Sequence, residues 1–175
     1  MYESAAPPQE DTADAEATSV SKATTESLMA GERILESLHT ADADIEQREQ
    51  AQRLGQDVPV HPLVQAMFSE METPDTYKYV LRVVEKIPPT HMEDALLVLP
   101  FDKVVSLFRY IDVWITREWN VSLSARILFF LMRTHHAQIV SNRVMRTTLV
   151  RLRTHVKNVL AKQKTLVGFH LAALR

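Results

Sequence analysis

The chain has 175 residues, enough for one domain of ordinary size with some length left over for a tail. It contains only 3 Gly and is 46% hydrophobic, a composition that favours an all-α fold. Cysteine is absent, which excludes disulfides, thiolate chemistry and zinc sites built from cysteine. The acidic start is unlike a signal or transit peptide, and no apolar run reaches membrane-spanning length, so we expect a soluble intracellular protein or fragment.

Charge is divided unevenly along the chain. Residues 1–100 contain 19 Asp and Glu against 7 Lys and Arg, whereas residues 101–175 contain 3 acids against 13 basic residues. A basic half of this kind is typical of proteins with an acidic or nucleic-acid partner. The two halves could equally neutralise each other within one fold, and the sequence leaves both interpretations open.

The first part of the chain divides into two segments. Residues 1–25 are rich in small, proline and acidic residues and hold almost no large apolar residue, which predicts a disordered acidic linker. Residues 26–58 carry two helical patterns, over 27–38 and 41–53, which we interpret as a flanking helical arm. The sequence GQDVPVHP breaks the chain there, so a helical C-terminal domain is expected over residues 59–175.

Prolines divide the next part of the chain into short predicted helices. The first begins at Pro62, and the second opens at Thr73-Pro74 and is stopped by Pro88. Thr90 and Glu93 have the spacing of a capping box, which predicts a third helix through residue 99. Repeated helical hairpins of this kind predict a compact multi-helix bundle or a short helical-hairpin solenoid.

The fourth predicted helix, Phe101–Trp119, has one strongly apolar face and an opposite face that carries Tyr110 and basic residues. Asp112 lies on the apolar face. A lone carboxylate there could act as a general base, but buried acids are usually paired. We therefore predict that Asp112 forms a buried pair, and Arg126 or Arg133 of the following helix could reach it.

The stretch from Asn120 to Ile139 is predicted to be the central helix of the core. Asn120 is a good N-cap residue, six consecutive apolar residues stand at positions 127–132, and no Gly or Pro interrupts the stretch. Only one narrow polar stripe remains on this helix, and it includes an aromatic residue. We expect a partner to contact this sector, which consists of Ser122, Arg126, Phe129, Arg133 and His136.

The adjacent histidines His135 and His136 are the most tempting candidates for chemistry. Neighbouring residues on a helix point about 100° apart, so the two rings cannot chelate one ion as an i, i+4 pair can. The sequence also shows no phosphate-binding loop, nucleophile elbow or paired acids at useful spacing. We therefore predict no catalytic residue, no metal and no cofactor, and we keep a metal-dependent hydrolase using the two histidines as the enzyme alternative.

The final segment, residues 143–175, combines an apolar stripe with a basic face. The stripe recurs every three or four residues, at Met145, Leu149, Leu152, Val156, Val159 and Leu166. Such a stripe packs in a core or forms a seam with a partner helix, and we assign partner binding to its first four members. The basic face consists of Arg143, Arg146, Arg153, Lys157 and Lys164. These five could track a phosphate backbone, dock on an acidic protein or be solvated, and the sequence leaves open whether the segment is one helix or two.

Several segments, taken in order, are similar to one known family. They are Met29–Ile34, Leu96–Phe101, Arg126 with Leu128–Leu131, His135–Asn142, and Gly168–Phe169 with Leu171–Leu174. Together they resemble the helical C-terminal domain of the WD-repeat proteins in the UTP-B subcomplex of the small-subunit processome. The resemblance covers residues 26–175 and is strongest from Ala95 onward, and it departs at His170, where the family has Asn.

The resemblance implies an assembly function without catalysis. Domains of this family follow tandem WD-repeat propellers, so the chain is expected to be a fragment of a longer protein, with its acidic start as a linker. The implied role is to pair with the equivalent domain of a paralogous WD-repeat subunit and so to help build UTP-B. That subcomplex acts with U3 small nucleolar RNA on pre-ribosomal RNA in the nucleolus. The alternative is a basic helical module that contacts the RNA backbone directly.

Overall fold

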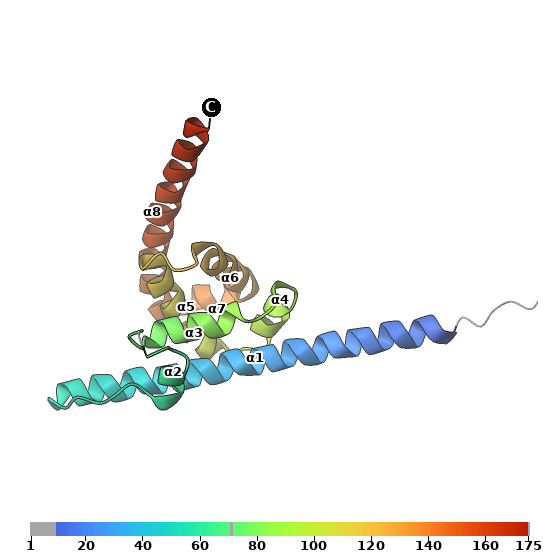
Figure 1. Ribbon diagram of the computed structural model, residues 1–175, viewed down its shortest axis with the longest axis horizontal. Helices are drawn as coiled ribbons and strands as arrows, with labels where there is room; N and C mark the ends of the chain where they lie inside the picture. The colour runs from blue at the N-terminus through green and yellow to red at the C-terminus, as the bar shows by residue number, and fades with distance from the viewer. Residues whose placement is uncertain (1–9, 71, 175) are drawn as a thin grey trace, which may run out of the picture.

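The computed structural model describes residues 10–70 and 72–174, with side chains from Thr25 onward. These residues form eight α-helices and no strand, which confirms the predicted all-α class (Figure 1). None of the described helices combines the length and the apolar character that crossing a membrane requires. Most of the predicted disordered linker, residues 1–25, lies outside the part described with side chains.

Helix α1, Glu10–Arg53, is the longest helix and lies along one side of the bundle (Figure 1). It joins the two helical patterns predicted over 27–38 and 41–53 into one helix, because no Gly or Pro separates them and their apolar positions stay in phase. Ile34, Leu38 and Ala41 are completely buried. The segment predicted to be a flanking arm therefore contributes side chains to the common core.

Helices α2, Pro62–Ala66, and α3, Thr76–Glu85, follow the loop after α1. Helix α2 begins at the predicted proline. Helix α3 begins later than its predicted opening at Thr73-Pro74, because the Asp75 carboxylate accepts hydrogen bonds from two backbone N–H groups of the first turn, at 2.9 and 3.1 Å. This N-cap gives partners to two N–H groups that would otherwise have none at the helix start, and it places the first helical residue at Thr76.

Helix α4, Pro89–Leu97, begins without a side-chain cap, so the predicted capping box of Thr90 and Glu93 is wrong. Pro89 takes the first helical position, where its missing N–H would have no partner in any case. Helix α1 packs closely on α4 at Gly31, where an added Cβ would lie only 3.1 Å from the carbonyl oxygen of Ala95. The absence of a side chain at Gly31 thus lets the two helices touch.

Helix α5, Phe101–Thr116, and not the helix after it, is the central helix of the core, and it contacts α1, α3, α6 and α8. Tyr110, predicted on the outer face, is buried because α1 covers that side, and its hydroxyl donates to Asp42 of α1 at 3.0 Å. Trp114 donates its indole N–H to the carbonyl oxygen of Tyr77 at 2.8 Å, which ties α5 to α3. Completely buried apolar side chains of α5 are Val104, Leu107, Phe108, Ile111 and Trp114.

Helix α6, Val121–Thr134, follows a tight corner in which Glu118 and Asn120 have positive φ angles of 57° and 37°. Asn120 caps the helix as predicted, because its side-chain oxygen accepts from a backbone N–H of the first turn at 3.3 Å. Only one side of α6 is buried and the other faces solvent. This helix is therefore a flank of the bundle.

The predicted continuous helix from Asn120 to Ile139 is wrong at His135. Backbone angles of −102° and 21° at this residue end α6 and turn the chain into a short helix α7, His136–Ser141. The turn carries Ile139 into the core and leaves the neighbouring Val140 exposed. No proline or glycine announces the turn, so composition alone could not predict it.

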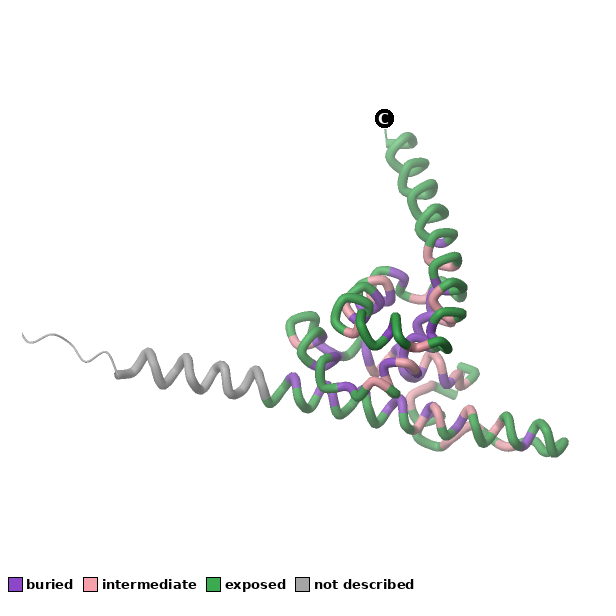
Figure 2. The backbone as a smooth tube through the Cα atoms, turned by 180° about the vertical axis from the view of Figure 1, so that it is seen from behind, coloured by how far each residue is buried: buried purple, intermediate pink, exposed green. Residues whose placement is uncertain are grey.

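The final segment is a single helix, α8, Arg143–Ala173, capped by Asn142. Its first half packs on α5 and α7, and its second half projects from the bundle (Figure 1). From Leu160 to Leu174 every residue is exposed, as the uninterrupted green end of the tube in Figure 2 shows. The apolar residues of this end thus have no cover within the described chain.

Candidate partner-binding surface

An apolar groove of about 580 Å³ lies between α6, α7 and α8. Helices α6 and α7 contribute Leu128, Phe129, Met132, Ile139 and Val140. Helix α8 contributes the apolar residues Leu149, Val150, Leu152, Val156 and Leu160. The charged residues in the lining are all cations, namely Arg146, Arg153 and Lys157. The groove is therefore an apolar surface with a basic border.

The turn at His135 and the helical period together create this groove. On α6, Ile127, Leu128 and Leu131 face the core, so Phe129 must point away from it and is 60% exposed. Val140 of α7 and Val150 of α8 are 68% and 63% exposed around the same groove. Contiguous exposed apolar side chains of this size mark interaction sites more often than isolated ones do.

The structure divides the residues predicted to bind a partner into three groups. Phe129, Leu149 and Val156 come together in the groove lining. Met145 is only 1% exposed and belongs to the core, and Leu152, also 1% exposed, forms the groove floor.

The remaining two predicted residues are the arginines of α6. Both are exposed, and Arg126 donates to the carbonyl oxygen of Pro89 at 2.8 Å, across the contact with α4. Neither Arg126 nor Arg133 lines the groove. Of the sector predicted on α6, Phe129 is thus the member that the structure places in the groove.

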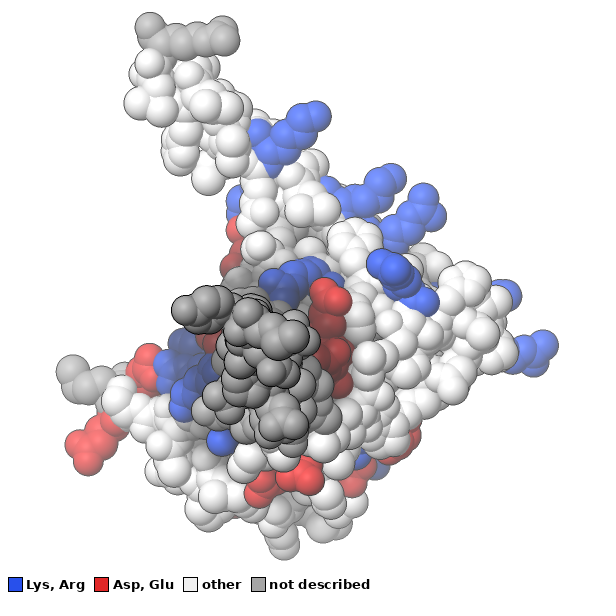
Figure 3. Space-filling model, turned by 90° about the vertical axis from the view of Figure 1, so that its right-hand side faces the viewer, with Lys and Arg blue, Asp and Glu red and all other residues white. Residues whose placement is uncertain are grey.

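The five basic residues predicted on α8 are all exposed, and Arg146, Arg153 and Lys157 border the groove. Within the described residues, none of the five forms an ion pair. Figure 3 shows Lys and Arg side chains gathered along α8 in the upper part of the molecule, with most Asp and Glu below. The excess of positive charge in the second half of the sequence is therefore not neutralised on this side of α8 by acids of the described chain.

The opposite side of α8 is held to α5 by contacts with a buried carboxylate. Asp112 is 6% exposed and accepts from Arg151 Nε at 2.7 Å and from His155 Nδ1 at 2.8 Å. Asp112 is thus buried and paired, but its partners are not Arg126 or Arg133, because both arginines lie on the side of α6 opposite its buried positions. Arg151 and His155 were not predicted as partners of Asp112, although their i, i+4 spacing on the side opposite Arg153 was a usable signal.

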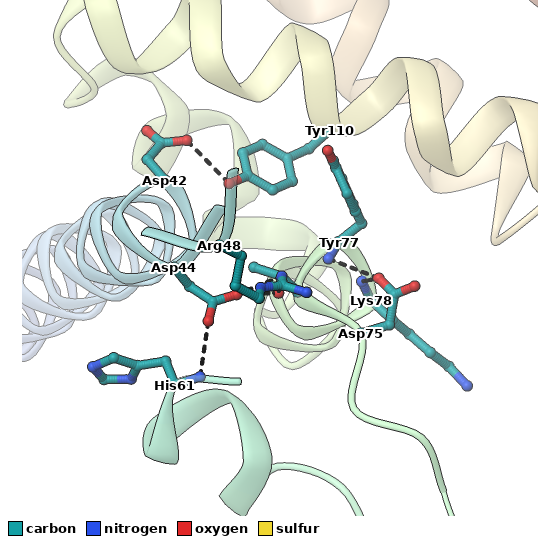
Figure 4. Close-up of polar contacts among 9 residues, drawn as sticks. Asp42, Asp44, Arg48, His61, Asp75, Tyr77, Lys78 and Tyr110 are labelled. Atoms are coloured by element: carbon teal, nitrogen blue, oxygen red, sulfur yellow. Dashed lines mark hydrogen bonds and ion pairs between the residues drawn. The ribbon is translucent and has the colours of Figure 1, made fainter. Parts of the chain in front are cut away.

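A second polar cluster joins α1 to the loop before α2, to α3 and to α5 (Figure 4). Asp44 is 2% exposed and accepts from Arg48 at 2.6 Å, from the backbone N–H of His61 at 2.8 Å and from the Thr76 hydroxyl. Asp42 accepts from Tyr110, and burial together with the Asp42 carboxylate raises the pKa of the Tyr110 hydroxyl above its ordinary value. These acids hold helices together.

The two adjacent histidines have separate surroundings. His135 Nδ1 lies 3.1 Å from the side-chain oxygen of Gln138, and its ring centroid lies 6.0 Å from that of Phe101. His136 is exposed. Among the residues that the structure describes, no three His, Cys, Asp or Glu side chains come close enough to hold a metal ion.

The helices that form the groove lie within the part of the chain that matches a known protein family. The model described as the Dip2/Utp12 family matches residues 76–175, from the first residue of α3 to the end of the chain. The chain belongs to the Dip2/Utp12 family. The match includes the groove, the basic residues of α8 and the contacts of Asp112. It confirms the resemblance seen in the sequence.

Relatives of this Dip2/Utp12 chain are much longer proteins. U3 small nucleolar RNA-associated protein 12 of Saccharomyces cerevisiae is 30% identical over an alignment 176 residues long, gaps included. The alignment covers 91% of this chain and 18% of the yeast protein. WD repeat-containing protein 3 of Homo sapiens is 29% identical over 159 residues, covering 87% of this chain and 16% of the human protein. The Dictyostelium discoideum homolog is 29% identical over 157 residues, covering 87% and 17%. The chain thus spans less than one fifth of the length of these relatives.

Proposed function

We propose that this chain is a non-catalytic protein–protein assembly module of ribosome biogenesis. It pairs with the corresponding domain of a paralogous WD-repeat subunit and so helps to build the UTP-B subcomplex of the small-subunit processome in the nucleolus. Membership of the Dip2/Utp12 family supports this setting. The yeast relative is named for association with U3 small nucleolar RNA, and the human relative for its WD repeats.

The observation that carries the proposal is the exposed apolar groove between α6, α7 and α8. Covering apolar surface contributes roughly 25 cal/mol per Å², and binding energy usually concentrates on a few large anchors in the centre of an interface. Phe129, the one aromatic residue in the lining, is suited to be such an anchor. A contiguous exposed apolar surface of this kind is what a pairing domain would offer to its partner.

The direct test is the mass in solution of the chain alone and mixed with the corresponding domain of a paralogous WD-repeat subunit. We expect a stable mixed complex both at about 0.1 M and at about 1 M salt, because apolar contacts are not screened by ions. Sedimentation equilibrium gives the masses. Two separate species at every concentration would contradict the pairing function.

The substitution Phe129→Asp sharpens this test. Loss of a central aromatic anchor costs about 2 kcal/mol or more, so we expect the dissociation constant to rise roughly 30-fold while far-UV circular dichroism stays unchanged. Leu54→Asp provides the control, because Leu54 is also strongly exposed but lies beyond the end of α1, away from the groove. Pairing that is insensitive to Phe129→Asp would remove Phe129 from the interface.

Direct contact with the RNA backbone is a second candidate function, favoured by the five basic residues of α8 that form no ion pair with described residues. Such binding should weaken steeply between about 50 and 200 mM salt, because it releases counterions from the phosphates. Fluorescence anisotropy with a segment of pre-ribosomal RNA measures this dependence. Affinity that does not change with salt would exclude backbone contact.

A further inference from the structure

The apolar lining of the groove continues along α8 after the bundle ends. At about 100° per residue, five apolar residues of α8 and its C-cap residue fall within one sector of roughly 60°. They are Leu149, Val156, Leu160, Val167, Leu171 and Leu174. The first three line the groove, and the last three lie on the projecting half, where each is more than half exposed. These six residues form one apolar stripe that runs from inside the bundle to the end of the helix. It differs from the stripe predicted in the sequence between Met145 and Leu166, and the word stripe refers to these six residues from here on.

A basic edge accompanies this stripe on one side. Arg146, Arg153, Lys157 and Lys164 fall within a sector of about 40° that adjoins the stripe. Their charges lack acidic neighbours on the same helix, because residues 143–175 contain no Asp or Glu. The cations that do form ion pairs, Arg151 and Lys162, lie on the opposite side of α8, against Asp112 and Glu118.

We propose that this face of α8 binds a long amphipathic helix of a partner protein, apolar along one side and acidic along the adjoining edge. The proposal rests on the assembly function given above and specifies the chemistry of the partner. The distance from Leu149 to Leu174 corresponds to about 38 Å of helix, so the partner helix needs roughly 25 residues for full contact. Its carboxylates would face the basic edge, and its apolar residues would cover the stripe.

The stripe and the edge together select this partner over two others. A second copy of this chain would offer the same basic edge, and its α8 has no acid to place against it. An RNA strand would neutralise the cations but would leave the apolar stripe in water. Single-strand binding also uses stacking aromatics, and Phe169, the aromatic residue on the projecting half, points away from the stripe.

The test uses the complete 175-residue chain and three synthetic helical peptides of about 25 residues. All three carry Leu at alternating three- and four-residue spacing, and one flank bears Glu, Gln or Lys. We expect the Glu peptide to bind at least tenfold more tightly than the Gln peptide by isothermal titration calorimetry at about 0.1 M salt. Equal affinity for the Glu and Gln peptides, or no binding of any peptide, would overturn the proposal.

Charge exchange tests the basic edge itself. Arg153→Glu should weaken the Glu peptide at least tenfold and strengthen the Lys peptide, because the altered edge now matches the opposite charge. Arg53→Glu is the matched control, since it makes the same change of charge at the exposed end of α1 and should alter neither affinity. Loss of binding to all three peptides alike in Arg153→Glu would refute a role for its charge.

The apolar stripe is tested on the projecting half, where substitutions do not touch the core. Val167→Ser should weaken all three peptides by a similar factor. Phe169→Ser is the control, because Phe169 is also exposed but lies on another side of the helix. Equal effects of the two substitutions would mean that the stripe has no preferred side, and the proposal would fail.

Measurements on the paralogous domain separate this inference from the assembly function. If that domain pairs with the chain regardless of Arg153→Glu and Val167→Ser, the assembly function stands and the inference is wrong. If the Glu peptide binds as expected and the domain does not pair, the surface stands and the assembly function is wrong. An oligouridine that displaces the Glu peptide and responds to Arg153→Glu but not to Val167→Ser would assign the edge to RNA and overturn the proposal.

Discussion

The two longest helices of the chain, α1 and α8, use their charged side chains differently. On α1, the Asp44 carboxylate accepts hydrogen bonds from the loop before α2 and from α3, and the Asp42 carboxylate accepts from Lys103 and Tyr110 of α5 (Figure 4). On α8, the five basic residues that face away from α5 form no ion pair within the described chain. These two carboxylates of α1 therefore hold helices together, whereas these five cations of α8 remain available for a partner.

The glycines of the same two helices repeat this contrast. Gly31 of α1 lies so close to α4 that a methyl group would contact the Ala95 carbonyl oxygen and the Val98 side chain, at 3.1 and 3.3 Å. Gly168 of α8 has nothing within 4 Å of the corresponding position. Substitutions on the two helices should therefore affect different properties, with folding sensitive to α1 and binding sensitive to α8.

The largest expected effect on stability is that of Asp44→Ala. This substitution leaves Arg48 and Thr76 without their buried acceptor, and breaking a buried ion pair from one side typically costs about 3 kcal/mol or more. Urea denaturation followed by circular dichroism measures the loss. Glu46→Ala is the control, because Glu46 is exposed on the same helix and should change stability by less than about 0.5 kcal/mol. Similar losses in both variants would contradict the contrast between buried and exposed charges.

Asp112→Ala should have the next largest effect, a loss of about 2 kcal/mol, because it removes the buried acceptor of Arg151 and His155 and loosens α8 from α5. Amide hydrogen exchange should rise in the first half of α8. The exposed pair of Glu118 and Lys162 provides a control, since Glu118→Gln should cost no more than about 0.5 kcal/mol. Unchanged exchange in α8 would show that Asp112 does not hold this helix.

Tyr110 gives a prediction that depends on pH. Burial and the neighbouring Asp42 raise its pKa in the folded state, so above about pH 10 the unfolded chain loses this proton first and stability falls as pH rises. Tyr110→Phe lacks the ionisable hydroxyl. We expect it to be about 1 kcal/mol less stable at neutral pH but to lose stability less steeply at alkaline pH. Parallel pH profiles of the two proteins would argue against a raised pKa.

The smallest expected effect compares the two glycines. Gly168→Ala should stabilise α8 locally by somewhat less than about 1 kcal/mol, because alanine is the better helix former and the position is open. Gly31→Ala should give no such gain, since its methyl group crowds the Ala95 carbonyl oxygen. Amide exchange and thermal unfolding measure the two effects. Equal stabilisation at both positions would mean that α1 and α4 tolerate separation.

Local signals in the sequence predicted several helix boundaries correctly. Pro62 and Asn120 stand at the predicted starts because a proline or a cap acts on the turn it belongs to. Periodicity also placed Phe129 on the exposed side of its helix. What a helical pattern could not predict is which neighbour covers each face. Tyr110 lies opposite the apolar face of α5 and is buried all the same, because α1 lies over it.

The candidate site could be predicted only in part, for a related reason. Phe129, Leu149 and Val156 were recognised singly, but the groove that unites them depends on the turn at His135, which has no sequence signal. Had α6 continued through Ile139, α7 would not form one wall of the groove. The partners of Asp112 were missed because their identity depends on how α8 is rotated against α5.

The continuity of α8 has a geometric consequence for any partner. Because one uninterrupted helix joins the anchored half to the projecting half, the contacts of Asp112 set the direction in which Val167 and Leu171 point, although these lie beyond the bundle. Inserting one residue after Val159 would turn the distal stripe by about 100° and advance it about 1.5 Å. Inserting four would restore its direction to within roughly 40° while moving it about 6 Å further out. The continuous helix thus fixes both the direction and the distance of the distal stripe relative to the bundle.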